Sequence, residues 1–300
     1  MIREEVIIYT IDLRFLVNFD QYLGRIGLSG APSATPQGVA TLQAAHRRNI
    51  GFENLDAMLQ RPIRIDPQSV FDKLVVQGRG GYCFEHNRLF SDALTAVGVR
   101  NRPLLARVRL GQPEDAVPPR THTCLLLLID GRPWVADAGF GGSDLAPLPL
   151  EEGVEVRTAD GARHRLRRTG ERGTFEGEWL LERAGPASAT DGRAAQHGDW
   201  QPQYVFDLSD VAPDDLEQAN HWASTRAQTR FTTLHVASIP HETGFASMVD
   251  RTLTIYGAAH GEGGTRRREI AGPADYADTL RTVFRIDLTE QEAASLPLFC

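Results

Sequence analysis

The sequence predicts a protein of the α+β class, in which a helical region, a region of antiparallel strands and a mixed region follow one another. Three observations predict this order. Before Gly98 the apolar residues recur at helical spacing, and the segments begin with N-capping signals. After Gly98 apolar and polar residues alternate, and Asp-Gly pairs separate the runs. The last part of the chain contains both patterns.

The composition is that of an ordinary globular protein. The chain has 300 residues, of which 41% are hydrophobic and 24% are charged. Its formal net charge of −7 excludes a general nucleic-acid binder, which would carry a basic face. Three cysteines do not indicate a disulfide framework, so we expect the reducing environment of the cytoplasm. No apolar run is long enough to span a membrane, and no signal peptide is expected at the N-terminus.

The N-terminal region is expected to form a small helical bundle. Thr35-Pro36 and Asp66-Pro67 each place a capping side chain directly before a proline, which is a typical start of a helix. Gly78 ends the second of these helices. The expected helices are Asp20–Ile26, Val39–Arg48, Ser69–Val75 and a last one that begins at Cys83, with a loop at Ile50–Leu55.

Cys83 stands at the start of the last helix of this bundle. Apolar residues recur at helical spacing from Phe84 to Val97. The unpaired N–H groups and the positive dipole end of a helix N-terminus favour a thiolate and make it a better nucleophile. Gly80 and Gly81 allow a sharp turn and leave room for a substrate. A lone cysteine is more often a small buried hydrophobic residue, so other residues must decide between the two interpretations.

The middle of the chain is expected to form a compact antiparallel sheet or barrel. Its strands are short, closely spaced and separated by turns, which is typical of that architecture. The tight turns are Asp130-Gly131 and Asp160-Gly161, and Gln112–Arg120 and Gly185–Asp199 are expected as loops, the latter mobile and on the surface. The expected strands are Leu104–Leu110, Thr121–Ile129, Pro133–Ala136, Val154–Arg157, His164–Leu166, Thr174–Leu181 and Gln203–Leu208.

The last part of the chain mixes helices and strands. Asp214 and Asp215 suit the first turn of one helix, and Thr289–Glu292 is a capping box that opens another. Expected helices are Pro213–Ser224 and Pro273–Ile286, and expected strands are Leu234–Ala237, Thr252–Tyr256 and Arg267–Ile270. The predicted organisation is an N-terminal extension at 1–17, a helical bundle at 18–98, a β-domain at 99–211, an interdomain helix at 212–226 and an α/β lid at 227–300.

A histidine and an aspartate flank the Asp130-Gly131 turn. If the loop consists of these two residues, His122 lies opposite Gly139, and Asp137 shares its face of the sheet. Diagonal neighbours of this kind are about 7 Å apart, within reach of a hydrogen bond between the side chains. A three-residue loop without a bulge would place them on opposite faces. The pair would supply the base and the orienting carboxylate that a nucleophilic cysteine needs, and the alternative is a surface histidine beside a turn aspartate.

Taken together, these motifs resemble the arylamine N-acetyltransferases, which move an acetyl group from acetyl-CoA to an amine. The matching segments are Phe52–Leu55, Arg79–Glu85 with Asn87, Arg120–His122 and Ala136–Gly141, and the resemblance runs from Asp20 to the final helices. It implies a cysteine-proteinase-like fold made of a helical bundle, an antiparallel β-barrel and an α/β lid. It also implies Cys83 as the nucleophile, His122 as the base and Asp137 as the carboxylate that orients the base.

The resemblance also implies the substrates and the surroundings of the site. The acyl donor would be acetyl-CoA, the acceptor an arylamine or a hydrazine, and the reaction would pass through an acyl-cysteine without a metal. Phe52, Phe84 and Phe140 are candidates for an apolar lining that excludes water and packs on an aromatic substrate, with ordinary core packing as the alternative. The remaining candidates are structural: a Glu53–Arg79 ion pair, a buried Cys124 and a terminal Cys300.

The sequence offers two interpretations of one candidate segment for the phosphates of CoA. The segment Gly261–Arg268 could offer backbone and guanidinium groups to phosphates, but a flexible hairpin loop with a charged strand edge is favoured. His86 and Arg88 stand where the resemblance leads us to expect Gln or Leu and a small or apolar residue. We therefore expect His86 to tune substrate specificity.

Three other functions remain as alternatives. Amide synthases of the same fold release or cyclise a polyketide chain from a carrier protein and keep the Cys, His and Asp residues. A cysteine hydrolase of the papain or transglutaminase type would use the same triad, and a non-catalytic binding protein would not need one. The sequence predicts no nucleic-acid or membrane partner, and either a monomer or a homodimer.

Overall fold

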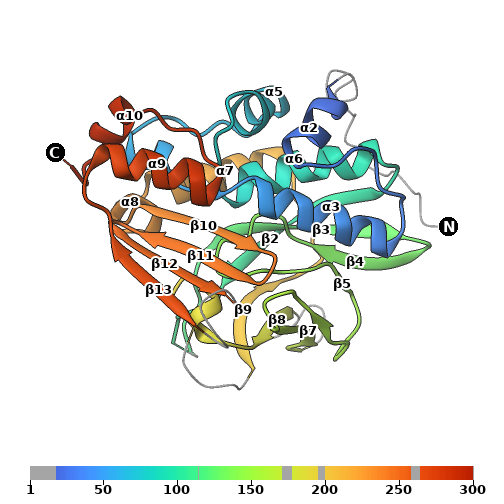
Figure 1. The fold of residues 1–300 in the computed structure, drawn as a ribbon. Coiled ribbons are helices and arrows are strands. Elements are labelled where there is room, and N and C mark those ends of the chain that lie inside the picture. The colour runs from blue at the N-terminus through green and yellow to red at the C-terminus, as the bar shows by residue number, and fades with distance from the viewer. Residues whose placement is uncertain (1–17, 114, 171–177, 195–199, 258–263, 300) are drawn as a thin grey trace.

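Two antiparallel sheets organise the protein in the computed structural model, which describes residues 18–113, 115–170, 178–194, 200–257 and 264–299 (Figure 1). The larger, eight-stranded sheet has the order β5-β4-β3-β2-β9-β8-β7-β6. A bridge between Glu152 and Leu166 links the loop after β5 to β7, so this sheet curls into a nearly closed barrel. Its strands are β2 (Arg100–Val108), β3 (Arg120–Ile129), β4 (Arg132–Ala136), β5 (Leu148–Pro149), β6 (Val156–Arg157), β7 (Arg163–Arg168), β8 (Trp179–Ala184) and β9 (Gln201–Phe206).

The smaller sheet contains one strand from the N-terminal region and four from the C-terminal region. Its order is β1-β10-β11-β12-β13. These strands are β1 (Phe52–Glu53), β10 (Val236–His241), β11 (Gly244–Val249), β12 (Thr252–Gly257) and β13 (Thr265–Glu269). Because β1 pairs with β10, the helical region and the C-terminal region share a sheet.

Helices cover one side of both sheets, with α3, α6 and α9 lying along it in Figure 1. The helices are α2 (Phe19–Arg25), α3 (Pro36–Asn49), α4 (Leu55–Met58), α5 (Pro67–Phe71), α6 (Cys83–Ala96), α7 (Pro213–Thr225), α8 (Arg230–Thr233), α9 (Pro273–Phe284) and α10 (Glu290–Ala294). A π-helical turn at Asp72–Val76 continues α5. The expected extension at 1–17 and Cys300 lie outside the described residues.

Strand β3 is apolar on both faces because it belongs to two cores. Leu125 and Leu127 pack against the N-terminal helices, together with Phe90 of α6. Cys124 is fully buried in the core of the barrel, as expected, beside Leu104 of β2. A third core lies between the smaller sheet and helices α9 and α10. The two cores on opposite faces of β3 explain why the sequence shows a continuous apolar run at this strand.

The predicted helix starts are confirmed by their caps. The side chain of Thr35 accepts a hydrogen bond from the amide of Gly38, and that of Asp66 accepts one from the amide of Ser69. Thr289 and Glu292 form the predicted capping box of α10. These signals are readable from sequence because both partners lie within four residues.

The hairpin between β3 and β4 has the predicted two-residue loop. Asp130 and Gly131 both have positive φ angles, 50° and 73°, as a type I′ turn requires. Ile129 therefore pairs with Arg132, and Leu125 pairs with Ala136. This register is the one from which the proximity of His122 and Asp137 was predicted.

Several expectations for loops and strands were wrong. The segment Ile50–Leu55 is not a loop, because β1 and the start of α4 lie in it. Strand β11 and helix α8 were not predicted, and the Asp160-Gly161 turn is a longer loop between the paired Arg157 and Arg163. The expected surface loop Gly185–Asp199 is partly buried, since Ala189, Thr190 and Asp191 are almost inaccessible and Thr190 bridges to Ser143. Residues 174–177 of the expected strand and 195–199 of the expected loop lie outside the described residues.

Candidate active site

Cys83 is the first residue of α6, and the backbone before it is held by β1. The amide of Glu53 donates a 2.7 Å hydrogen bond to the carbonyl of Gly81. Tyr82 is the extended N-cap residue, and the carboxylate of Glu85 accepts a hydrogen bond from its amide. The Cys83 side chain is only 2% exposed, and its Sγ lies 3.7 Å from the carbonyl of Thr121. The thiol therefore sits at the positive end of the helix dipole and faces strand β3.

His122 and Asp137 meet beside this thiol. The Nε2 of His122 lies 2.7 Å from Oδ2 of Asp137, and both side chains are buried. Since a carboxylate only accepts, Nε2 carries the proton and Nδ1 is left as the basic nitrogen. A hydrogen bond with Cys83 is one of the interactions that raise the pKa of His122. The three side chains thus form a Cys–His–Asp arrangement drawn from α6, β3 and the loop after β4.

Burial and charge act in opposite directions on this pair. Burial alone would lower the pKa of His122, but the charge and hydrogen bond of Asp137 and the contact with Cys83 outweigh it and raise the pKa to about 10. Burial would raise the pKa of Asp137, but the same interaction and a hydrogen bond from Asn87 lower it. The geometry therefore favours an imidazolium beside a carboxylate, which is the form that stabilises a neighbouring thiolate.

Asp137 is held by more than the histidine. Its Oδ1 accepts hydrogen bonds from Asn87 Nδ2 at 3.0 Å and from the amide of Gly139 at 2.9 Å. Asn87 also accepts a hydrogen bond from the amide of Ala138. The carboxylate thus has a partner on each oxygen, and helix α6 positions both the thiol and the aspartate.

Two residues of α3 hold the loop after β4 and were missed by the sequence analysis. Gln43 accepts a hydrogen bond from the amide of Asp137 and donates one to Leu145 O. The guanidinium of Arg47 donates to the carbonyls of Asp137, Phe140 and Ser143, and it lies 3.5 Å from Asp144. No local pattern marks these residues, because their partners lie about a hundred positions further along the chain.

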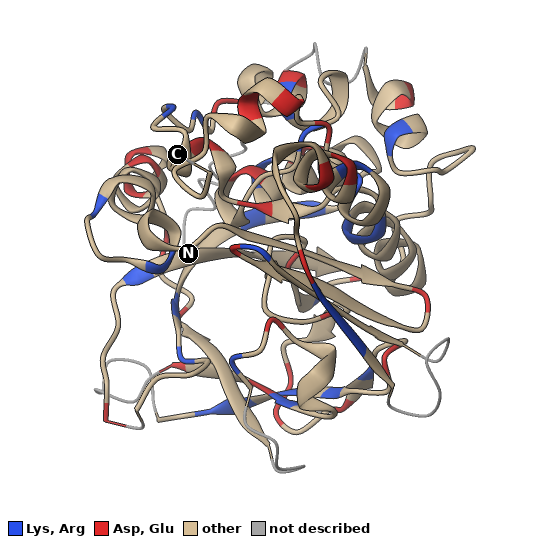
Figure 2. Ribbon diagram, turned by 60° about the vertical axis from the view of Figure 1, so that its left-hand side comes forward, with Lys and Arg blue, Asp and Glu red and all other residues tan. Residues whose placement is uncertain are grey.

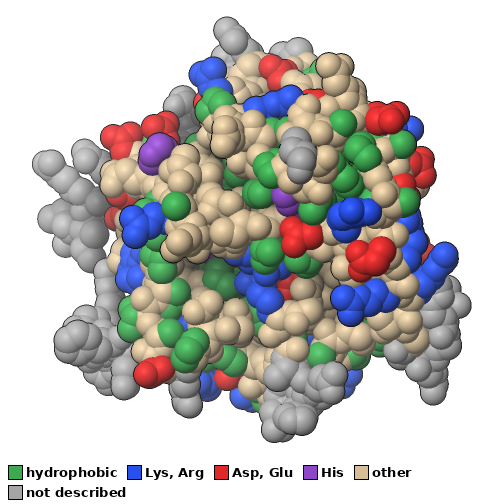
Figure 3. All heavy atoms as spheres, turned by 90° about the vertical axis from the view of Figure 1, so that its left-hand side faces the viewer, with side chains coloured by type: hydrophobic (Ala, Val, Ile, Leu, Met, Phe, Trp, Pro, Cys, Tyr) green, Lys and Arg blue, Asp and Glu red, His purple; other side chains and the backbone are tan. Residues whose placement is uncertain are grey.

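Cys83 and His122 open onto a cavity of about 730 Å³. Phe52 and Phe140 line this cavity, whereas Phe84 lines a smaller, separate cavity beside Asn87. The ring of Tyr204, another residue that the sequence did not single out, packs 4.8 Å from the His122 ring. Figure 3 shows a hollow bordered by hydrophobic and basic side chains on the face at the left of Figure 1. With Phe52 and Phe140 in its wall, the cavity of Cys83 is mostly apolar and suits an aromatic ligand.

Comparisons with known proteins place this chain in a family. A model of the N-acetyltransferase family matches residues 37–293. The chain is 37% identical over 213 residues to the arylamine N-acetyltransferase of Escherichia coli K12, covering 71% of this chain and 69% of the relative. The chain belongs to the arylamine N-acetyltransferase family. It is also 34% identical over 277 residues to the Mycobacterium tuberculosis H37Rv member, covering 90% of this chain and 89% of the relative.

A solved structure extends the similarity to the fold of the family. The Mycobacterium marinum arylamine N-acetyltransferase in complex with CoA superposes with a TM-score of 0.79 at 31% identity. The superposition covers 93% of this chain and 98% of that protein. The chain is therefore an acetyltransferase by family, and the motifs that suggested the resemblance lie at its Cys–His–Asp arrangement.

The two glycines before Cys83 have another role than the one that the sequence led us to expect. A Cβ on Gly80 would meet the carbonyl of Gly51 at 2.2 Å, and one on Gly81 would meet the Glu85 carboxylate. These two glycines therefore make room for β1 and for the cap of α6, and neither lines the cavity of Cys83. The close approach at the thiol belongs to Gly139, whose added Cβ would lie 2.6 Å from the Cα of Cys83.

The expected Glu53–Arg79 ion pair is present at 3.0 Å and belongs to a larger buried network. Arg79 also contacts Asp56, and Lys73 joins Asp56 to Glu85 at 2.6 and 2.7 Å. Burial raises the pKa of Glu85 to about 7, although Lys73 opposes this shift. The network lies behind the turn before Cys83, so its role in this family member is to hold that turn.

His86 lies behind the cavity wall and does not reach the cavity. Its Nε2 donates to the carbonyl of Gly51 at 3.2 Å, and its Nδ1 lies 2.9 Å from Nε2 of His46. The next link is Tyr22, whose hydroxyl lies 3.0 Å from Nδ1 of His46. Because Gly51 O can only accept, each link donates toward it, and both imidazoles are neutral Nε2–H tautomers. Burial lowers the pKa of His86 to about 3, which agrees with this assignment.

The candidate phosphate segment Gly261–Arg268 lies partly outside the described residues. Its described arginines, Arg266–Arg268, appear as a continuous basic run on β13, the edge strand of the smaller sheet (Figure 2). Arg268 pairs with Asp275 at 2.8 Å, and none of the three lines the cavity of Cys83. The favoured interpretation of a charged strand edge fits these residues.

Proposed function

We propose that this protein transfers an acetyl group from acetyl-CoA to an arylamine or a hydrazine through an acetyl-Cys83 intermediate. In the resting site the thiol proton lies on His122 Nδ1, in keeping with the raised pKa of His122, and in the first half-reaction the Sγ thiolate attacks the thioester carbonyl carbon. The bond from that carbon to the CoA sulfur breaks, and CoA leaves with the proton from His122. Asp137 keeps His122 in the Nε2–H tautomer and stabilises the imidazolium.

In the second half-reaction the amine nitrogen attacks the carbonyl carbon of acetyl-Cys83. The carbon–sulfur bond to Cys83 breaks, and the amide leaves the site. His122 takes the proton that the nitrogen loses and keeps it in the resting site. Phe52 and Phe140 pack on the aromatic ring of the acceptor and keep water away from the intermediate. The meeting of Cys83, His122 and Asp137 beside one largely apolar cavity supports this proposal.

Two arginines in the wall of the same cavity could bind the donor, acetyl-CoA. Arg193 and Arg230 both line it and both form ion pairs with Asp191, at 2.8 and 3.2 Å. Two guanidinium groups share one carboxylate, so one positive charge remains for an anionic ligand. We assign these arginines to the phosphates of CoA. The M. marinum relative, which was solved with CoA, motivates the choice of donor.

We further propose that the chain divides at the predicted boundaries, and that its bundle, barrel and lid are arranged as in a cysteine proteinase. Within the described residues, no helix is both long and apolar enough to cross a bilayer. We propose that the reaction takes place in the cytoplasm, with acetyl-CoA as the donor.

Intact mass measurement after incubation with acetyl-CoA tests the proposal. The wild-type protein should gain the mass of one acetyl group, which a peptide map locates on Cys83, and lose it when an arylamine is added. The Cys83→Ala variant should show neither change while keeping its unfolding temperature. The Cys124→Ala variant is the matched control, since this buried cysteine does not line the cavity, and Cys83 should still be acetylated in it. Turnover in Cys83→Ala, or acylation only from a long-chain thioester, would overturn the assignment.

A further inference from the structure

The rim of the cavity of Cys83 carries apolar side chains that face solvent. Val117 is 80% exposed and Trp222 is 38% exposed, and both line this cavity. They come from distant parts of the chain, the loop between β2 and β3 and the helix α7. Exposed apolar side chains that gather beside a cavity are typical of a ligand-binding groove. The rim is therefore a candidate contact for the part of a substrate that extends away from Cys83.

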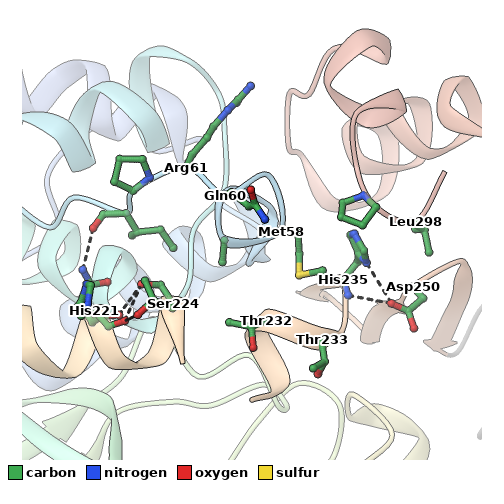
Figure 4. A pocket seen from close by; sticks show the side chains of 16 residues that line it. Met58, Gln60, Arg61, His221, Ser224, Thr232, Thr233, His235, Asp250 and Leu298 are labelled. Carbon is green, nitrogen blue, oxygen red and sulfur yellow. Dashed lines mark hydrogen bonds and ion pairs between the residues drawn. The ribbon is translucent and has the colours of Figure 1, made fainter. Parts of the chain in front are cut away.

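Helix α7 places Trp222 where two cavities adjoin. Trp222 also lines an outer cavity of about 410 Å³, and the residues that line both cavities are Pro119, Thr121 and Trp222. Figure 4 shows the neighbouring His221 and Ser224 of α7 at a different cavity, of about 870 Å³. The indole therefore lies between the cavity of Cys83 and the outer cavity, on a side of α7 that these two neighbours do not share.

The indole of Trp222 is available for stacking. Within the described residues, no other aromatic ring and no cation packs on it, in contrast to Trp200, whose ring has the guanidinium of Arg165 at 4.1 Å. Aromatic groups that stack on such a ring gain energy beyond that of the buried area. A partly exposed and unstacked indole at the rim of a cavity thus suits an aromatic ligand.

Thr121 connects this ring to the reacting atoms. Its carbonyl oxygen lies 3.7 Å from Sγ of Cys83, and the residue also lines the outer cavity together with Trp222. An aromatic molecule that extends from Thr121 toward the indole therefore has its near end beside the thiol. Phe52 and Phe140 contact that near end in the proposed reaction, and Trp222 remains for the far end.

The charges of the outer cavity distinguish between the two substrates. Its wall contains the carboxylates of Asp210 and Asp215, and its one cation among the described residues, Arg120, forms an ion pair with Asp207. Such a wall repels the phosphates of CoA, for which two other arginines are available. An arylamine, which is uncharged at neutral pH, meets no such repulsion. The side of the cavity at Trp222 therefore suits the acceptor and not the donor.

We propose that Trp222 determines the specificity for the acceptor and selects arylamines with two or more aromatic rings. The ring that carries the amine lies beside Cys83 and His122, and the outer ring stacks on the indole and packs on Val117. This inference rests on the proposed function, because it names the class of amine that receives the acetyl group. It assigns to Trp222 a contact with the substrate and no part in proton transfer.

Calorimetric titration without an acyl donor tests the stacking. The ligands are 4-aminobiphenyl, which has an aromatic outer ring, and 4-cyclohexylaniline, which has the same length but a saturated outer ring. We expect the wild-type protein to bind 4-aminobiphenyl about tenfold more tightly. The Trp222→Ala variant should bind the two ligands with equal affinity, and Trp222→Phe should keep most of the difference. Because no acetyl group is transferred, a protein that lacked the proposed activity could still pass this test.

A second tryptophan provides the matched control. Trp200 lines neither cavity, so Trp200→Ala, compared at equal folded fraction, should keep the difference between the two amines. No binding of 4-aminobiphenyl, equal affinity of the wild-type protein for the two amines, or an undiminished difference in Trp222→Ala overturns the proposal. Titration with CoA separates the acceptor from the donor. Weaker binding of CoA to Trp222→Ala, with unchanged binding of 4-aminobiphenyl, would assign the indole to the donor and overturn the proposal as well.

Discussion

The side chain of Asn87 donates a 3.0 Å hydrogen bond to the carboxylate of Asp137, fifty positions further along the chain. Its second amide hydrogen goes to the carbonyl of Thr123, and its oxygen accepts from the amide of Ala138. Asn87 lies on α6 one turn after Cys83. Helix α6 therefore carries the thiol and also binds the loop that carries the carboxylate. The distance between Cys83 and Asp137 is set by this one helix.

Replacing Asn87 with alanine should reduce acetyl transfer more than it reduces stability. Asp137 keeps its contacts with His122 and Gly139 but loses the partner that fixes its orientation. A misplacement of about 1 Å at such a site costs on the order of a hundredfold in rate. The matched control is Asn101→Ala, which removes hydrogen bonds to Ser91 and Thr95 away from the site. Steady-state rates and urea unfolding should show similar losses of stability in both, but a loss of kcat/KM only in Asn87→Ala. Equal rates in the two variants would remove Asn87 from the positioning of Asp137.

The correctly predicted parts of this fold are those that depend on residues close together in the sequence. Helix caps at Thr35 and Asp66 and the Asp130-Gly131 turn each depend on residues within four positions, so their patterns are visible in the chain. The turn then determined a register, and the register brought His122 to Asp137. This step worked because the two-residue loop contains no bulge that would shift one strand relative to the other.

The parts that were missed depend on contacts between distant segments. Strand β1 has only two residues, and it exists because β10, almost two hundred positions later, pairs with it. Arg47 looks like one of several basic residues at the end of α3, but it is buried against the loop after β4. Phe52 and Phe84 are both phenylalanines in the motif segments, yet only Phe52 lines the cavity of Cys83. No local pattern separates these cases.

Arg47→Gln should destabilise the protein strongly and lower its activity. The variant loses donors to three carbonyls and leaves Asp144 without its buried partner, and breaking a buried pair costs about 3–5 kcal/mol. Arg48→Gln is the control at the next position, where the side chain is half-buried rather than buried. Urea unfolding should show a change of less than about 0.5 kcal/mol for this control. A mild effect of Arg47→Gln would mean that the loop after β4 is held by Gln43 alone.

His86 should tolerate glutamine but not leucine. A glutamine amide can donate to the carbonyl of Gly51 and accept from His46, so the chain of hydrogen bonds survives. Leucine leaves both groups buried and unpaired, at a cost of about 1–3 kcal/mol for each group. The measurement is the free energy of unfolding of both variants, with the KM for the amine as a second readout. His86 stacks on Phe52 at 6.3 Å, so a change in this KM in the glutamine variant would support the expected role in specificity.

The stability of the protein should fall between about pH 6.5 and pH 10. The pKa of His122 is about 10 in the folded state against 6.5 for the free side chain, because Asp137 and Cys83 outweigh its burial. The folded protein then binds more protons than the unfolded chain in this range, so rising pH favours unfolding. The contribution is complete below pH 6.5 and is lost as the pH passes 10. Unfolding by urea across this range should give a flatter profile for Asp137→Asn, and parallel profiles would contradict the assignment.

Gly139→Ala should inactivate the protein, because this glycine is the point of contact between the barrel and the helix of Cys83. An added Cβ would lie 2.6 Å from the Cα of Cys83 and 2.9 Å from Nδ2 of Asn87. The Cα of Cys83 belongs to the backbone of helix α6, which cannot move aside as the end of a flexible side chain can. The loop after β4 must therefore move away from α6, at a cost of about 1–3 kcal/mol for an overpacked core. The movement separates Asp137 from Asn87 and changes the approach of His122 to the thiol.

Gly24→Ala is the matched control, since a Cβ at this position in α2 meets no atom within 4 Å, and alanine should stabilise that helix slightly. Acetylation of Cys83 by acetyl-CoA, followed by mass measurement at equal folded fractions, should be lost in the first variant and unchanged in the second. Normal acetylation in Gly139→Ala would show that the close packing of the loop against α6 is not required for the reaction.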